Sequence, residues 1–329
     1  MIQDWNDTKS VKHDQPAVMA LLESELRQGL ERYWQVAETI FQGGPVQLVG
    51  PTRDNFSLSR NFFSTLFLYS YYRCGIPNER RILYIAVNQC LRGMVTGCDN
   101  ILDDEYKTTL ETDLPPKAHR FRSVLDIMVS DRILFAILLE YCTSNNIPTT
   151  KLHEASKASL QALIRSGAQE ASEEGGITER LSPEKILSRV HHYKTGMLFQ
   201  CTWAIPRVLE DQITDIELGV QEALYRIGMG CQIFDDMVDL CLDLRENRHN
   251  YVASSIVHEE KAIDAYLQEN TRLESAEPLY ARFPEFHSRM KDKAIWYLKD
   301  GLAALFAPQD AFLVDPAIAF IAGRIGVTL

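Results

Sequence analysis

The sequence lacks several features that mark common protein classes. It has no basic run, and its net charge of −11 argues against nucleic acid as a partner. The longest apolar run, Ile133 to Leu139, is far too short to cross a bilayer. The first fifteen residues are polar and contain no hydrophobic signal core. We therefore expect a soluble, cytoplasmic protein without a transmembrane segment.

A disulfide framework is also missing. The cysteines are odd in number, form no C-x-x-C motif and mostly lie among apolar residues. This pattern is typical of reduced cysteines in the core of a cytosolic protein. The seven are Cys74, Cys90, Cys98, Cys142, Cys201, Cys231 and Cys241.

Strand signals are almost absent, and helical periodicity runs through nearly every segment. We predict one all-α helical-bundle domain over residues 1–329 around a central apolar cavity, with 1–14 as a loose N-terminal tail. Gly43 and Gly75 are expected to end the first two helices, and Ser182-Pro183 to start a later one. The expected helices cover about 16–41, 56–73, 77 into the first acidic cluster, 121–142, 149–172, 182–206, 216–244, 257–270 and 285–306, with a last one after Pro316.

Two acidic clusters stand within this apolar helical sequence. Asp99 and Asp103 are four residues apart, as are Asp235 and Asp239, so each pair projects from one helix face. A single pair of this kind is usually a solvated acidic face. Both clusters here have core-like flanks, LRGMVTGC and IGMGCQIF, and buried carboxylates need partners.

The composition of the clusters indicates which partner they need. Like charges this close repel one another, and more strongly in a cleft, so we expect a cation between them. Carboxylates without thiolate or imidazole favour Mg²⁺, which keeps coordination positions for phosphate oxygens. No H-x-x-H or E-x-x-H pair accompanies them, so a zinc or di-iron bundle is disfavoured. The pattern predicts metal-assisted handling of a phosphorylated substrate between two helices that face each other across a bundle cavity.

Four segments, in this order, resemble the trans-isoprenyl diphosphate synthases, the polyprenyl synthetase family of the class I isoprenoid synthase superfamily. The first, Asp99-Asn100-x-x-Asp103, has asparagine where the family's first D-D-x-x-D has its second aspartate. The others are the K-T-G-M-L-F segment at 194–199, the glycine-rich Gly228-x-Gly230-Cys231-Gln232 and a complete second D-D-x-x-D at 235–239. The resemblance spans most of residues 15–300.

The resemblance implies an isoprenoid synthase-like fold and a Mg²⁺-dependent prenyltransferase that ionises an allylic prenyl diphosphate and transfers the prenyl group. Lys194 would neutralise diphosphate charge and Gln232 would present its amide, so both are candidate catalytic residues that also bind substrate, together with Thr195. A homodimer is implied as well. Three Mg²⁺ ions, recruited with the diphosphate, would be held by Asp99, Asp103, Asp235, Asp236 and Asp239.

Departures from the family pattern leave the second substrate open. Chain-elongating members carry G-G-K-R-x-R-P before the second helix, where this chain keeps only Arg53 within 47–54; Arg53 or Arg60 could bind isopentenyl diphosphate instead. One alternative is a class I terpene cyclase that uses a single diphosphate. Asn250 and Ser254 have its N-x-x-x-S spacing, but His258 stands where glutamate is expected. A second alternative is a non-catalytic partner subunit of a prenyl synthase.

The prenyl tail is expected along the apolar face that leads into the first cluster, against Leu91, Met94 and Val95. These positions carry no aromatic ring, and the nearest one upstream, Tyr84, is about 22 Å from Asp99 along a helix. We therefore expect a pocket that accepts tails of farnesyl or geranylgeranyl length.

Overall fold

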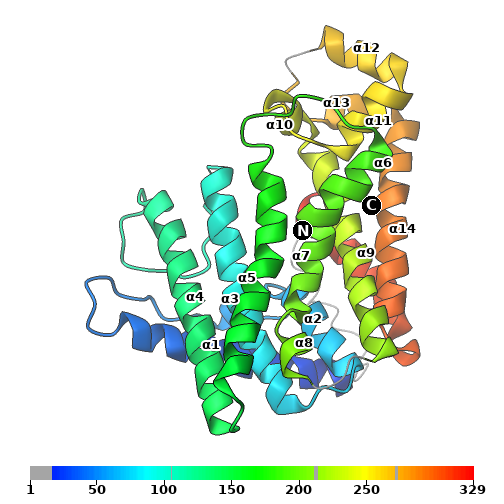
Figure 1. The fold of residues 1–329 in the computed structure, drawn as a ribbon. Helices are drawn as coiled ribbons and strands as arrows, with labels where there is room; N and C mark the ends of the chain where they lie inside the picture. Colours follow the sequence, from blue (N-terminus) through cyan, green and yellow to red (C-terminus); the bar gives the residue numbers. More distant parts are fainter. Residues whose placement is uncertain (1–16, 105, 211–213, 271–272) are drawn as a thin grey trace.

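The computed structural model describes residues 17–104, 106–210, 214–270 and 273–329 (Figure 1). Within these ranges there is no strand, only one β-bridge between Leu48 and Thr112, so the predicted all-α class is confirmed. No helix of the described part is both long and apolar enough to cross a membrane. The long helices are α1 (Ala17–Phe41), α2 (Phe62–Arg73), α3 (Asn78–Leu102), α4 (His119–Ser144), α5 (Thr149–Ala171), α9 (Asp215–Val238), α14 (Pro284–Leu305) and α15 (Val314–Ile325).

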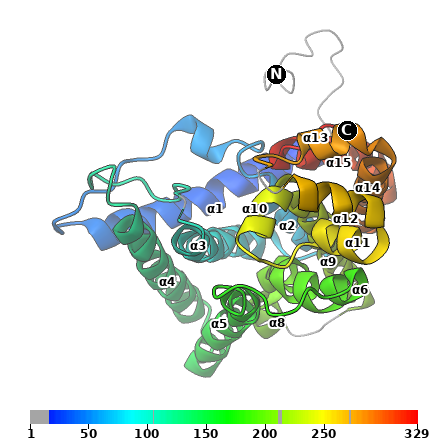
Figure 2. The ribbon, with the colours of Figure 1, turned by 90° about the horizontal axis from the view of Figure 1, so that it is seen from above.

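The long helices form a bundle, and shorter helices from the C-terminal part of the chain cover one end of it. α3 packs between α1 and α4, and α9 packs along α14. The C-terminal ends of α3, α5 and α9 lie at the end of the bundle that the shorter C-terminal helices cover (Figures 1 and 2). These shorter helices are α10 (Leu240–Arg245), α11 (Tyr251–Glu259), α12 (Lys261–Glu269) and α13 (Glu277–Arg282).

The first helix ends follow the predicted glycine signals. Gly43 and Gly75 have φ of 75° and 72°, a left-handed conformation that glycine adopts without steric cost. After α2, the amide of Ile76 donates to the carbonyl of Tyr71 at 3.1 Å, which satisfies a carbonyl that the helix itself leaves open. Thr214 and Glu217 form a reciprocal capping box that starts α9.

The predicted helix 182–206 is not continuous. It is divided into α6 (Pro183–Lys185), the π-helical segment η2 (Ile186–Gly196), α7 (Met197–Gln200) and a 3₁₀ turn η3 (Cys201–Trp203), and Pro206 then starts α8 (Pro206–Leu209). Proline at 206 lacks the amide that would continue the ladder of hydrogen bonds. π-helical turns often occur at functional sites.

Other boundaries also differ from the sequence expectation. α9 ends at Val238 rather than near 244, and α11 begins at Tyr251 rather than near 257. Asn250 explains the second change, because its side chain accepts the amide of Ala253 and so caps α11 at 2.9 Å. The short helix α13 was not predicted.

The glycines of the G-x-G-C-Q segment allow α9 to approach two neighbours closely. A Cβ atom at Gly228 would lie 2.8 Å from the carbonyl oxygen of Thr195, and one at Gly230 would lie 2.9 Å from that of Ala294. Side chains at either position would therefore push α9 away from η2 or from α14. This packing fixes the distance between Thr195 and the acidic end of α9.

Candidate functional site

A cavity of about 360 Å³ opens at the end of the bundle where α3, α5 and α9 terminate. Its walls come from α3, α5, η2, α7, α9 and the segment after α10. Nine residues selected from the sequence line it: Met94, Val95, Asp99, Asp103, Lys194, Thr195, Gln232, Asp235 and Asp239. Glu170, Asp243, Glu246, Arg248 and Lys107 line it too and were not selected.

The two predicted carboxylate pairs share this cavity. Burial, then Glu170 and then Asp103 raise the pKa of Asp99 to about 7. Burial and the neighbouring Asp239 likewise raise the pKa of Asp235 to about 6, although its side chain reaches the open cavity. Carboxylates that resist ionisation in this way are electrostatically suited to a divalent cation. In the described residues, no three His, Cys, Asp or Glu side chains already converge on one point, so oxygen atoms of a ligand would have to complete each coordination sphere.

Asn100 explains one departure from the family pattern. Its side chain is buried and points into the loop after α3, where Nδ2 donates to the carbonyl of Lys107 at 3.0 Å and Oδ1 accepts the Lys107 amide at 2.8 Å. An amide can make both bonds, whereas an ionised aspartate can only accept. The asparagine therefore holds the loop and removes no carboxylate from the cavity.

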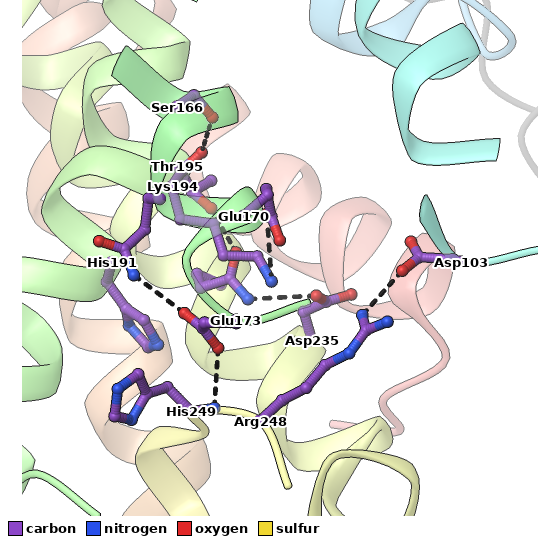
Figure 3. A network of polar contacts seen from close by, with 12 residues as sticks. Asp103, Ser166, Glu170, Glu173, His191, Lys194, Thr195, Asp235, Arg248 and His249 are labelled. Carbon is purple, nitrogen blue, oxygen red and sulfur yellow. Dashed lines mark hydrogen bonds and ion pairs between the residues drawn. The ribbon is translucent and has the colours of Figure 1, made fainter. Parts of the chain in front are cut away.

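Lys194 supplies a positive charge among these carboxylates. Its Nζ lies 3.2 Å from Oε1 of Glu170 on α5 (Figure 3). Burial by itself would lower the pKa of Lys194, but attraction to Glu170 and then Asp236 outweighs it and raises that pKa. The hydroxyl of Ser166 donates to the Lys194 carbonyl at 2.8 Å and fixes η2 against α5. Lys194 is thus ammonium, held in the wall by Glu170.

Thr195 and Gln232 form a chain that leads to the second cluster. The Thr195 hydroxyl donates to Oε1 of Gln232. Nε2 of Gln232 donates to Oδ2 of Asp235 at 3.2 Å and to Oδ1 of Asp236 at 2.9 Å. Hydrogen bonds to both Oε1 and Nε2 therefore fix the orientation of the Gln232 amide.

Four residues selected from the sequence lie outside the cavity: Arg60, which lines a separate recess described below, and Asp236, Leu91 and Arg53. Asp236, expected to hold metal, is only 3% exposed and its carboxylate faces His191 and the start of α11, which conflicts with a role as a metal ligand. Leu91, expected to contact the tail, packs in the core at 4% exposure. Arg53, expected to bind a second diphosphate, is exposed in η1 (Arg53–Phe56).

Arg248 reaches across the cavity mouth. Its Nη1 donates to Oδ1 of Asp103 at 2.7 Å (Figure 3). Its Nε lies 2.8 Å from Oε2 of Glu246. The guanidinium therefore joins the segment after the second cluster to the first cluster. Sequence reasoning missed this contact because the two residues are far apart in the chain and nothing in the local pattern signals it.

A small basic recess lies against α3, about two helical turns before the first cluster. Arg60 and Arg92 line it, and Arg92 Nη1 donates to Oδ1 of Asn61 at 3.1 Å. Burial, then the charges of Arg60 and Arg324, lower the pKa of Arg92. Arg60 pairs with Asp54, whereas no carboxylate of the described ranges lies within ion-pair distance of Arg92. Arg92 stands seven residues before Asp99, on the same helix face and about 10 Å away along α3.

The N-x-x-x-S spacing at 250–254 has a structural explanation. Asn250 is fully buried, caps α11 and donates from Nδ2 to the carbonyl of Asp236 and to Oδ2 of Asp243, both at 2.8 Å. Ser254 is also fully buried, and its hydroxyl donates to the carbonyl of Leu181. Neither residue lines the cavity.

Comparison with known proteins identifies the fold. No family model matches the chain, and no curated protein matches its sequence. Among solved structures, a polyprenyl synthetase from Streptomyces coelicolor A3(2) aligns with a TM-score of 0.56 at 16% identity, over 94% of this chain and 100% of the other. A geranylgeranyl pyrophosphate synthetase from Pyrococcus horikoshii Ot3 aligns with a TM-score of 0.54 at 14% identity, over 92% and 98%. A geranyltransferase from Legionella pneumophila gives a TM-score of 0.54 at 12% identity, over 94% and 98%. The chain has the trans-isoprenyl diphosphate synthase fold, as the resemblance implied.

Proposed function

We propose that this protein is a Mg²⁺-dependent prenyltransferase that ionises an allylic prenyl diphosphate and transfers the prenyl group. The observation that carries the proposal is the composition of one cavity. Two carboxylate pairs, from α3 and α9, line the same space as the Lys194 ammonium, and apolar side chains from α3, α5 and α7 line another part of it. The fold shared with prenyl synthases agrees with this chemistry.

The chain's own residues have distinct roles in this proposal. Asp99, Asp103, Asp235 and Asp239 fit Mg²⁺, because all four offer carboxylate oxygen and line one cavity. Bound Mg²⁺ would supply Lewis-acid neutralisation of the leaving diphosphate. Lys194 would add a fixed positive charge where negative charge develops on the leaving group.

The apolar part of the wall suits a prenyl tail. Met94, Val95, Leu163 and Leu198 line the cavity together with the carboxylates. A dry apolar surface protects an allylic cation from water, which would otherwise quench it. The loop that Asn100 holds and the segment that carries Arg248 lie at the cavity and are candidate covers.

The basic recess favours prenyl transfer to a second substrate over cyclisation. Arg60 and Arg92 line the recess, and the charges of Arg60 and Arg324 both repel that of Arg92. Arg92 has only the neutral Asn61 as its hydrogen-bond partner among the described residues. An anion such as the diphosphate of isopentenyl diphosphate would relieve that repulsion. We therefore replace Arg53 by Arg92 and Arg324, beside Arg60, as the proposed contacts of the second diphosphate.

A homodimer is proposed from the surface of α4. Five exposed apolar residues follow a helical spacing that places them on one face, and α4 lies at the outer edge of the molecule (Figure 2). Exposed apolar stripes of this kind commonly mark association sites. A second copy of this chain would cover the stripe, and Met128→Lys should then give a monomer in sedimentation, whereas an unchanged mass would exclude this face. The stripe consists of Phe121, Val124, Met128, Phe135 and Leu139.

Incubation of the pure protein with geranyl, farnesyl and geranylgeranyl diphosphate, each with and without isopentenyl diphosphate, tests the function. We expect Mg²⁺-dependent release of pyrophosphate and a longer prenyl diphosphate as product. Release without elongation would indicate a cyclase, and no release from any substrate would indicate a non-catalytic subunit. Arg92→Gln should weaken isopentenyl diphosphate binding at least tenfold while the affinity for the allylic substrate stays unchanged.

A further inference from the structure

We propose that the buried pair His191–Asp236 is the positioning element of this cavity, which orients Gln232 and the segment carrying Arg248 without contacting the substrate. This inference rests on the proposed function, and it assigns Asp236 a role other than metal binding. It is drawn from a hydrogen-bond centre that joins η2, α9 and α11.

The centre is one carboxylate with three donors from three elements. Oδ2 of Asp236 lies 2.9 Å from Nε2 of His191 in η2 and accepts the amide of Tyr251 at the start of α11. Oδ1 accepts Nε2 of Gln232, one turn earlier in α9, at 2.9 Å. His191 and Asp236 are 1% and 3% exposed, so water cannot replace a lost partner. Burial alone would raise the pKa of Asp236, but His191 and these hydrogen bonds lower it.

The first consequence concerns Gln232. Its Nε2 donates to Asp235 and Asp236 at once, while its Oε1 accepts the hydroxyl of Thr195. A flipped amide would set an oxygen against two carboxylates and a nitrogen against a donating hydroxyl. Asp236 therefore determines the orientation of Gln232, and Gln232 in turn holds one oxygen of Asp235 at the cavity wall.

The second consequence concerns the segment before α11. The Tyr251 amide is anchored on Asp236, and Nδ2 of Asn250 donates to the Asp236 carbonyl at 2.8 Å. Arg248 lies just before these two anchors and reaches Asp103 across the mouth. Loss of the centre would free this segment and with it the guanidinium.

Two substitutions at His191 distinguish the loss of its hydrogen-bond donor from a change in the volume of its side chain. His191→Leu removes the donor, whereas His191→Gln keeps an amide nitrogen near the place of Nε2. We expect calorimetric binding of Mg²⁺ with inorganic pyrophosphate to weaken about 10–100-fold in His191→Leu and to recover to within threefold of wild type in His191→Gln. The same two substitutions at the adjacent His192, whose ring contacts Tyr225 instead, provide the control. Equal binding in His191→Leu and wild type would overturn the proposal.

Hydrogen exchange without any ligand gives a second reading. In His191→Leu the peptide 246–256 should exchange at least tenfold faster, while α14 keeps its protection. If wild type fails to bind Mg²⁺ and pyrophosphate, the proposed function fails, but this exchange result still decides whether His191 and Asp236 hold the segment. Unchanged exchange at 246–256 would refute the positioning role.

A substitution at Asp236 remains informative if His191→Leu does not fold. Asp236→Asn keeps the size of the side chain, but its single amide oxygen cannot accept from Gln232 on one side and from His191 and Tyr251 on the other. Without ligand, the peptide 246–256 should therefore exchange faster in Asp236→Asn, as in His191→Leu. Unchanged exchange together with weaker binding of Mg²⁺ and pyrophosphate would indicate that Asp236 is needed as a metal ligand, and the inference would be wrong.

Discussion

Asp99→Asn should stabilise the metal-free protein and abolish its response to Mg²⁺. Burial, Glu170 and Asp103 oppose ionisation of Asp99, whose pKa rises from 3.8 to about 7. At pH 8 the folded metal-free protein therefore carries a charge that its surroundings disfavour. A neutral amide of the same shape removes that charge and keeps the packing.

The size of the effect follows from the pKa. A rise from 3.8 to about 7 sets an upper limit of about 4 kcal/mol at pH 8. Asp99 is half-buried, so solvent screening reduces this to about 1–2 kcal/mol. For a chain of 329 residues, that corresponds to a rise in melting temperature of about 1.5–3 °C.

Thermal melting followed by circular dichroism at pH 8 measures this change in stability, first with a chelator present and then with Mg²⁺ and inorganic pyrophosphate. In chelator, Asp99→Asn should melt above wild type. With ligand at about a hundred times its dissociation constant, wild type should gain about 2.7 kcal/mol and the variant much less, so the order reverses. Asp104→Asn is the matched control, because Asp104 is exposed, pairs with Arg120 and has a positive φ that asparagine tolerates. A variant that melts at or below wild type in chelator, or gains as much from Mg²⁺, would refute the electrostatic reasoning.

Three further outcomes are expected. Asp99 and Asp235 keep their protons in the folded state up to about pH 7 and pH 6, so unfolding releases protons above pH 4. The stability of the metal-free protein should therefore fall, and its Mg²⁺ affinity rise, as pH increases from about 5 to 8. Flat profiles in melting and calorimetry would contradict this expectation. Arg248→Gln removes the partly exposed ion pair with Asp103, so the free energy of unfolding should change by less than about 1 kcal/mol. Mg²⁺ alone should bind several-fold more tightly, because Asp103 no longer has a competing cation. Weaker Mg²⁺ binding by calorimetry would argue that Arg248 organises the site. Met94→Phe narrows the cavity beside the first cluster and should shorten the accepted tail or the product; an unchanged length profile by mass spectrometry would place the pocket floor elsewhere.

Local patterns in the chain were sufficient for the elements and for most of the site. Helical periodicity, the glycines that end α1 and α2 and the proline that starts α6 depend on interactions within a few residues, so they can be read in order. The carboxylate pairs could be predicted for the same reason, because a spacing of four places both members on one helix face. The breaks at η2 and after Val238 could not, because they arise where the helices meet other elements.

Asp235 and Asp236 show where sequence reasoning ends. They are adjacent and chemically identical, yet one lines the cavity and the other is buried against His191. Adjacent helical residues point about 100° apart, so the direction of each depends on which neighbour α9 packs against. That packing is decided by the close approaches at Gly228 and Gly230, to η2 and α14.

The sequence by itself determined the all-α class, the two acidic clusters as candidate metal sites, and the resemblance of their motifs to those of prenyl synthases. These follow from residue type and short-range spacing, which need no knowledge of distant contacts. Only the tertiary structure decided that the charges of Arg60 and Arg324 act on Arg92, and that Arg248 reaches Asp103. Charge–charge contacts between distant segments depend on how whole helices pack, and no local pattern encodes that packing.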